Sequence, residues 1–158
     1  MGNNLTNEQR HENMLRQIKN FRLLDDDFMT TCFKENTEAV ELVLRIVLEK
    51  PDIKVEDVKT QYDLKNIRGR SVRLDIYAVD SENKKYNIEI QRADSGAGAR
   101  RARYNSSLID GNILPKGISP DNISDTFIIF ITENDVIGGN KPIYHIDRYI
   151  RELNEYFN

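Results

Sequence analysis

The sequence predicts an α/β fold in which a mixed β-sheet carries helices on its faces. Residues 72–80 and 86–91 alternate apolar and polar side chains with a period of two, as the strands of a half-buried hairpin do. Residues 40–48 instead repeat apolar side chains at helical spacing. Residues 126–132 form a short apolar run, which is typical of a buried strand with helices on both sides.

The N-terminal half supplies two further kinds of element. Residues 1–20 are polar, and we expect them to form an arm outside the domain. Residues 23–50 predict two helical segments, of which the second begins at Asn36 or Thr37, because these side chains suit a helix N-terminus. Residues 53–64 alternate again and predict the first strand of the sheet.

The C-terminal half completes the predicted order of elements. A basic helix is expected within residues 94–114, ahead of the apolar strand at 126–132. Residues 143–146 predict a short strand, and residues 145–157 an amphipathic helix. Its apolar side chains would be Ile146, Ile150, Leu153 and Phe157. The expected order is therefore α-β-β-β-α-β-(β)-α.

Composition limits the classes of protein that the chain can belong to. Its 158 residues suit one domain, expected over residues 21–158, and Cys32 as the single cysteine excludes an intrachain disulfide or a Cys-rich zinc site. The sequence contains no apolar run of membrane-spanning length and no signal peptide, so we expect a cytoplasmic protein without a membrane partner. With a net charge of −3, any contact with nucleic acid must come from a local basic patch.

The hairpin brings together three oxygen-bearing side chains. Asp75 lies in its first strand, and Glu89 and Gln91 project from one face of its second. Two carboxylates at one point repel each other, and a hard divalent cation such as Mg²⁺ removes that repulsion. The pattern is therefore compatible with a metal site for phosphodiester hydrolysis. The alternative is that Asp75 and Glu89 are solvated surface residues paired with Arg73 or Lys85.

Several ordered motifs resemble one known family. The stretches LDIYAVD, KYNIEIQRAD and ARRARYNSSLIDG resemble the PD-(D/E)XK nuclease family transposases, also called recombination-promoting nucleases. The earlier LLDDDFMTTCFKEN resembles the opening segment of that family, and the later FIIFITENDV resembles its core strand. The likeness covers about residues 21–157.

The resemblance implies a restriction-endonuclease-like αβββαβ core and a DNA endonuclease associated with recombination or mobile elements. It implies Asp75 and Glu89 as the two carboxylates that hold Mg²⁺ or Mn²⁺. Gln91 stands where the wider superfamily has lysine, so it is the third catalytic candidate, and the identity of the general base stays open because glutamine accepts no proton. The relatives continue beyond the final helix, so a C-terminally shortened domain is one expectation here.

Candidates for the surroundings of the site follow from the same motifs. A further carboxylate could come from Asp26, at the aspartate of the D-x-x-[FM] segment, or from Glu38 or Glu41, with helix capping or solvation as the alternative for each. The candidates for contact with phosphate, with a solvated basic face as the alternative, are Arg92, Arg100, Arg101, Arg103 and Tyr104. By helical spacing, Arg101 lies about 100° away from the face shared by the other three residues of that helix.

Two other functions use the same residues. A non-catalytic module could keep this fold and bind nucleic acid or a protein, which the acidic net charge and the missing lysine favour. An RNA-cleaving enzyme would use the same carboxylates. A nuclease that cuts both strands of a duplex generally needs two active sites, so we expect a homodimer as one possible assembly.

Overall fold

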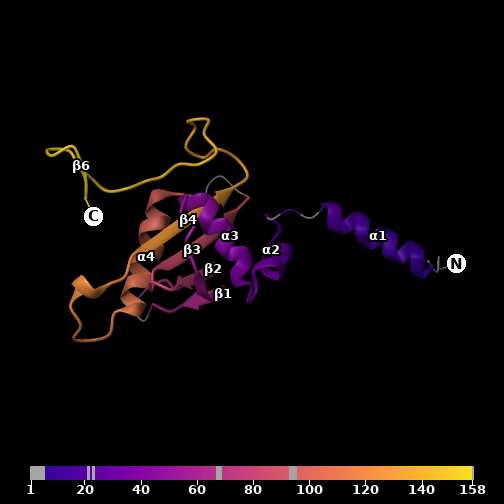
Figure 1. Ribbon diagram of the computed structural model, residues 1–158, viewed down its shortest axis with the longest axis horizontal. Coiled ribbons are helices and arrows are strands. Elements are labelled where there is room, and N and C mark those ends of the chain that lie inside the picture. The colour runs from indigo at the N-terminus through magenta and orange to yellow at the C-terminus, as the bar shows by residue number, and fades with distance from the viewer. Residues whose placement is uncertain (1–5, 21, 23, 67–68, 93–95, 158) are drawn as a thin grey trace.

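The computed structural model has a four-stranded mixed sheet at its centre, with helices on both faces (Figure 1). The predicted α/β class is therefore confirmed. The residues that the structure describes are 6–20, 22, 24–66, 69–92 and 96–157, with the backbone alone for Ile18 and Asp26.

The helices and strands follow the predicted order as far as the fourth strand. In the described residues the helices are α1 (Asn7–Asn20), α2 (Asp26–Phe33), α3 (Thr37–Leu48), α4 (Ala99–Ile113) and a short 3-10 turn, η1 (Pro120–Asn122). The strands are β1 (Val55–Leu64), β2 (Val72–Asp80), β3 (Lys85–Gln91), β4 (Thr126–Thr132), β5 (Tyr149–Ile150) and β6 (Glu155–Tyr156). The N-cap of α3 is Asn36, whose side chain accepts from the backbone N–H of Ala39, as the sequence predicted.

The sheet has the order β1-β2-β3-β4. β2 is antiparallel to both of its neighbours, β1 and β3, whereas β3 and β4 are parallel and pair along their whole length, from Lys85–Thr126 to Gln91–Thr132. Parallel neighbours need a crossover connection, and α4 provides it. The helix that follows β3 therefore packs back onto the sheet beside β3 and β4.

Two apolar clusters lie on opposite faces of the sheet. α2 and α3 cover one face, where Met29 and Leu44 pack with Ile76 and Ile88. α4 covers the other, where Ile109 packs with a second set of buried side chains: Leu64, Leu74 and Tyr77. Burial of both clusters fixes the position of each helix against the strands.

The predicted faces of β2 are correct only in part. The sequence placed Val72, Leu74, Ile76 and Ala78 on one face, yet Leu74 packs under α4 while Ile76 and Ala78 pack under α2 and α3. The change of face coincides with an irregularity in the ladder. The β1–β2 pairs pass from Thr60–Ile76 to Tyr62–Leu74, and the intervening Gln61 has a φ of 51°. A kink of this kind turns the following side chains away from regular alternation.

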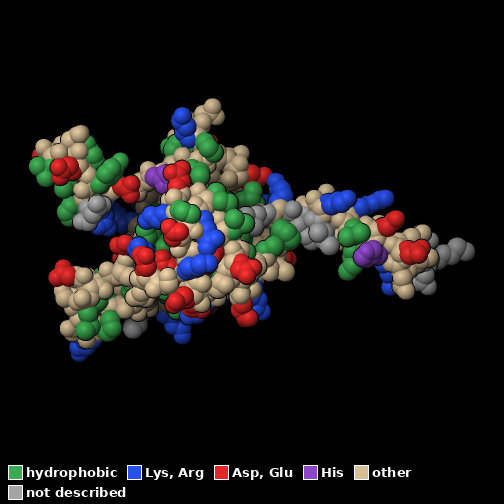
Figure 2. Space-filling view, in the orientation of Figure 1, with side chains coloured by type: hydrophobic (Ala, Val, Ile, Leu, Met, Phe, Trp, Pro, Cys, Tyr) green, Lys and Arg blue, Asp and Glu red, His purple; other side chains and the backbone are tan. Residues whose placement is uncertain are grey.

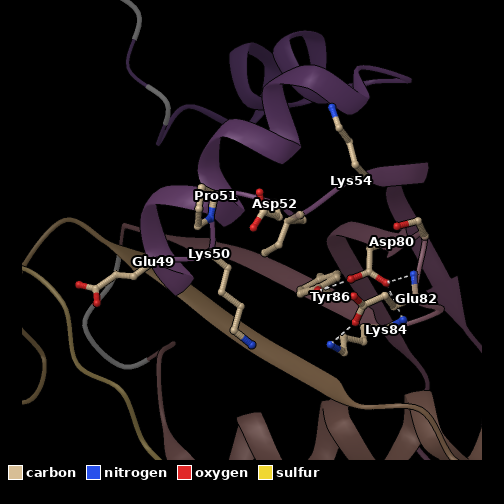
Figure 3. Close-up of a pocket in the computed structure, with 11 residues that line it drawn as sticks. Glu49, Lys50, Pro51, Asp52, Lys54, Asp80, Glu82, Lys84 and Tyr86 are labelled. Atoms are coloured by element: carbon tan, nitrogen blue, oxygen red, sulfur yellow. Dashed lines mark hydrogen bonds and ion pairs between the residues drawn. The ribbon is translucent and has the colours of Figure 1, made fainter.

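A carboxylate closes the β2–β3 hairpin. Asp80 accepts from the backbone N–H groups of Glu82 (3.0 Å) and Lys84 (2.8 Å) and from the hydroxyl of the buried Tyr86 (2.6 Å). Asn83 adopts the left-handed conformation that the turn requires, with a φ of 65°. Figure 3 shows Asp80, Glu82, Lys84 and Tyr86, which line one side of a small pocket. The turn sets the register that brings Asp75 and Glu89 to equivalent heights on the two strands.

The two ends of the chain extend away from the sheet and its covering helices in Figure 1. Residues 7–20 of the expected arm form α1, which projects from the body in Figure 1. The amphipathic helix expected over 145–157 is wrong, because this segment extends away from the body and contains the short β5–β6 pair. An amphipathic helix needs an apolar surface to cover, and here Ile146 stays 80% exposed. The strand expected at 143–146 is also wrong.

The helices are too short or too polar to span a lipid bilayer. No helix in the described part of the chain is long and apolar enough to cross a membrane.

We expect Asp80→Ala to lower the free energy of unfolding by about 2–4 kcal/mol, because it removes three hydrogen bonds and leaves the buried hydroxyl of Tyr86 unpaired. Urea unfolding measures this loss. The control is Tyr86→Phe, which keeps both turn bonds and should cost about 1 kcal/mol. Equal losses in the two variants would contradict a role for the turn bonds.

Candidate active site

The candidate site lies where β2 and β3 stop pairing. Their last registered pair toward the site is Ile76–Ile88, and the next residues are Asp75 and Glu89. Beyond that pair, a carboxylate oxygen of Asp75 accepts from the backbone N–H of Ile90 at 2.9 Å. The side chain of Asp75 thus takes the place that a backbone carbonyl would have in a continued ladder. The two predicted carboxylates therefore lie where the pairing of the two strands ends, Asp75 on β2 and Glu89 on β3.

Glu89 is buried completely, with 0% of its side chain exposed. Its Oε1 accepts from the side-chain amide of Asn87 at 2.9 Å, and its Oε2 accepts from the guanidinium of Arg101 at 2.5 Å. Burial raises the pKa of Glu89, and the charge of Asp75 raises it further, against the lowering effects of Asn87 and Arg101. The sequence left open Arg73 or Lys85 as partners of the two carboxylates; in the structure Arg73 pairs with Asp63, and Lys85 donates to the backbone carbonyl of Asn83.

Two asparagines connect Glu89 to α4. Asn105 of α4 donates to Oδ1 of Asn87 at 3.0 Å, and Asn87 donates to Glu89 and to the backbone carbonyl of Ile76. Both asparagines are buried. Arg101 and Asn105 are four residues apart and therefore share a face of α4. One helix thus reaches both oxygens of the Glu89 carboxylate, Arg101 directly and Asn105 through Asn87.

Sequence reasoning missed Asn87 and Asn105. The available signals were weak, because Asn87 lies two residues before Glu89 on a strand and Asn105 lies four residues after Arg101 on a helix. Each spacing predicts a shared face but not a contact between the two elements. Only the crossover geometry brings these two faces together.

Gln91 lies at the end of β3, two residues beyond Glu89 and half-buried. Its side chain packs against Gly96, where a Cβ atom would come within 1.9 Å of the Gln91 amide oxygen. A glycine is therefore required at position 96 while Gln91 keeps this orientation. The structure thus places the Gln91 side chain at the end of β3, in contact with Gly96.

The three further acidic candidates lie in different places. Glu41 bonds the backbone N–H of Val55 at 3.0 Å and pairs with Arg45, which holds α3 against the start of β1. Val55 at the start of β1 pairs with Asp80 of β2. Asp80 is five residues from Asp75, which corresponds to about 17 Å along the strand. The backbone N–H of Val55 lowers the pKa of Glu41. Glu41 is therefore a structural residue in this arrangement.

The other two acidic candidates are near the N-termini of α2 and α3. Glu38 is exposed in the first turn of α3. The side chain of Asp26 is outside the described part of the structure, but its neighbour Asp25 forms an ion pair with Arg92 at 3.2 Å. Since Arg92 directly follows Gln91, the start of α2 lies beside the site end of β3.

The five candidates for phosphate contact divide into three groups. Arg101 reaches Glu89 and also lies over the ring of Phe130, 5.9 Å from its centre. Arg92 pairs with Asp25, and Tyr104 donates to the backbone carbonyl of Arg70 in the β1–β2 loop. The remaining two side chains, Arg100 and Arg103, are exposed on α4. The face in Figure 2 shows basic side chains interspersed with acidic ones.

The donor set fits a hard divalent cation. No group of three His, Cys, Asp or Glu side chains that could hold a metal occurs among the described residues. Mg²⁺, however, commonly uses one or two carboxylates, with water and substrate phosphate as its other ligands. Asp75 and Glu89 supply two carboxylates, and the guanidinium of Arg101 already places a positive charge against the second. These two carboxylates match the kind and number of side-chain ligands that Mg²⁺ commonly takes from a protein.

Comparison with protein families gives one match. The model of the family described as PD-(D/E)XK nuclease family transposase matches residues 31–157. No curated protein matches the chain, and no solved structure matches it. The matched range contains α3, the whole four-stranded sheet and α4, so it includes both carboxylates and the helix that reaches Glu89.

We expect Asn105→Leu to lower the free energy of unfolding by about 1–3 kcal/mol, because the variant leaves Oδ1 of the buried Asn87 without its donor. Chemical denaturation followed by circular dichroism measures the change. The control is Ser107→Ala on the same helix, whose exposed hydroxyl bonds only the carbonyl of Arg103, so its effect should stay below about 0.5 kcal/mol. A loss no larger than that of the control would argue against the asparagine connection.

Metal-free protein should become more stable when Glu89 is replaced by glutamine. Because the pKa of Glu89 is raised above 4.5, the folded state holds this proton more tightly than the unfolded chain does, and stability falls as pH rises through the folded-state pKa. We expect Glu89→Gln to be about 1 kcal/mol more stable than the unaltered protein at pH 8, with a smaller difference near pH 4.5.

Thermal and urea unfolding in EDTA at both pH values test this expectation. The exposed Glu56→Gln is the matched control and should change stability little at either pH. A Glu89→Gln protein less stable than the parent at pH 8 would show that the ionised carboxylate is well compensated.

Proposed function

The chain belongs to the PD-(D/E)XK nuclease family transposases, and from this premise we propose that it is a Mg²⁺-dependent DNA endonuclease acting in recombination or on mobile elements. The observation that carries the proposal is the pair of carboxylates at the point where β2 and β3 separate. One of the pair is completely buried. A buried carboxylate beside a second acid costs stability, so its presence is understandable if it binds a cation during function.

The roles of the three central residues follow from their positions. Asp75 and Glu89 would hold the divalent ion, which when bound neutralises charge on the scissile phosphate and makes a water more acidic. Asp75 is oriented by the backbone N–H of Ile90, and Glu89 by Asn87. Gln91 at the end of β3 would orient the attacking water, because its side-chain amide can both donate and accept hydrogen bonds. It would not act as the general base, since an amide takes up no proton at neutral pH.

DNA would approach the site across α4. Arg100 and Arg103 are exposed there, and Arg101 lies between them and the carboxylates. Arginine binds phosphate through two parallel hydrogen bonds, so these residues would position the backbone of the substrate. Arg92 and Tyr104 contribute only if their present partners, Asp25 and Arg70, release them. A homodimer would place two such sites on one duplex.

A binding module without catalysis is the second candidate function. The ion pair between Arg101 and Glu89 favours it, because a carboxylate whose charge is already balanced by arginine can have a purely structural role and need not bind a metal. Against it, a binder of nucleic acid gains nothing from carboxylates that face phosphate, since the two charges repel. The two functions differ in their need for metal, which a cleavage experiment measures.

Purified protein incubated with supercoiled plasmid and Mg²⁺ or Mn²⁺ should nick the DNA, and EDTA should abolish nicking. We expect Asp75→Asn to lower the rate at least about 100-fold, because it removes a charged metal ligand. Asparagine still offers an oxygen to the N–H of Ile90, so the fold should be kept. Gel electrophoresis of plasmid forms over time measures the rate.

The matched control is Asp57→Asn, an exposed carboxylate on β1 that pairs with Lys59 away from the site. It should nick at the unaltered rate. Folded protein that binds DNA without cleaving it in either metal would support the binding module instead. A single-stranded RNA substrate in parallel reactions distinguishes a DNA enzyme from one that cleaves RNA.

A further inference from the structure

Arg101 occupies the carboxylate oxygen of Glu89 that faces away from Asn87. Its guanidinium donates to Oε2 at 2.5 Å, while Asn87 donates to Oε1 at 2.9 Å. A divalent ion held by Asp75 and Glu89 needs a lone pair of the same carboxylate. Two positive groups cannot share one oxygen closely, because like charges a few ångströms apart repel by several kcal/mol at an effective dielectric constant of about 20. Arg101 and the ion therefore compete for Glu89.

The two partners of this ion pair differ in their exposure to solvent and in their other contacts. Glu89 is 0% exposed, whereas 41% of the Arg101 side chain is exposed. The other contacts of the guanidinium are weak: a 3.4 Å bond to the carbonyl of Gly96 and the face of Phe130 at 5.9 Å. An arginine cannot lose its proton at physiological pH, so it leaves by moving rather than by deprotonation. Because its side chain is partly exposed to solvent, the free-energy cost of that movement is small.

We propose that Arg101 is a built-in counter-cation, which neutralises Glu89 in the metal-free protein and is exchanged for the divalent ion when the ion binds. The inference rests on the proposed metal site and adds a step to it. In the absence of metal, Arg101 keeps a buried carboxylate from standing uncompensated in the core. Once displaced, its guanidinium stays tethered to α4 at the edge of the site, where a substrate phosphate would lie.

The second connection from α4 is of a different kind. Asn87 and Asn105 are both buried, and neither is charged. Neither of them competes with a cation for Oε2, because Asn87 bonds Oε1. The asparagines are therefore positioning residues that stay in place during the exchange, and Arg101 is the part that moves.

The test measures metal affinity and stability, without activity. Mn²⁺ binding is followed by loss of the free-ion electron paramagnetic resonance signal, and melting temperature is measured in EDTA and in saturating Mn²⁺. We expect Arg101→Gln to bind Mn²⁺ about 10-fold more tightly than the unaltered protein, because its competitor is removed. We also expect its melting temperature to fall by roughly 5 °C in EDTA and to be largely restored by Mn²⁺.

Two control variants define the site of binding and the role of charge. Arg100→Gln removes the same charge from the neighbouring exposed position on α4 and should change affinity less than about twofold, with no loss of stability. Asp75→Asn should abolish the tight Mn²⁺ site, which identifies the ion as the one bound between the strands. Should Arg101→Gln not fold, Arg101→Lys keeps the charge with a weaker grip and should show tighter Mn²⁺ binding than the parent.

The outcomes separate this inference from the proposed function. If the unaltered protein binds no Mn²⁺, or Asp75→Asn binds it equally well, the metal site and the counter-cation role both fail. If binding depends on Asp75 but Arg101→Gln has unchanged or weaker affinity, the counter-cation role alone is overturned. A melting temperature that falls equally with and without Mn²⁺ also overturns that role. Tighter binding together with a deficit that Mn²⁺ repairs supports the exchange.

Discussion

The burial of one carboxylate organises this structure. Glu89 lies on an inner strand of the sheet with no exposure to water, so nearby charges and dipoles act on it more strongly than they would in water. Three neighbouring groups stabilise its charged form: the side-chain amide of Asn87, the guanidinium of Arg101 and the backbone N–H of Asp75 in β2. The apolar clusters on the two faces of the sheet hold these groups at the required distances.

The candidate site lies where the regular pairing of β2 and β3 ends. β2 remains paired to β1 through Val72 and β3 remains paired to β4 through Gln91, yet β2 and β3 pair with each other only as far as Ile76–Ile88. Each of the two diverging strands is thus supported by its outer neighbour. Asp75 and Glu89 are therefore both carried by paired strands rather than by loops, which fixes their backbone positions.

Sequence patterns predicted the parts of the fold that depend on short-range rules. The hairpin of β2 and β3, the apolar run of β4 and the Asn36 cap all concern residues close together in the chain, and the hairpin placed Asp75 and Glu89 on adjacent strands. What they could not predict depends on distant contacts. Asn105 reaches Asn87 only through the crossover of α4, and the C-terminal segment has helical spacing without a surface to cover.

The crossover position of α4 also determines when the site can assemble during synthesis of the chain. The ribosome releases β3 before α4, and the parallel pairing of β3 with β4 can form only after α4 has been synthesised. Until then Glu89 has neither Arg101 nor the Asn105 connection, and the chain lacks the strand that supports it. An incomplete chain therefore lacks the contacts that hold Glu89 in place, and the site with its two carboxylates can assemble only after α4 and β4 have joined the sheet.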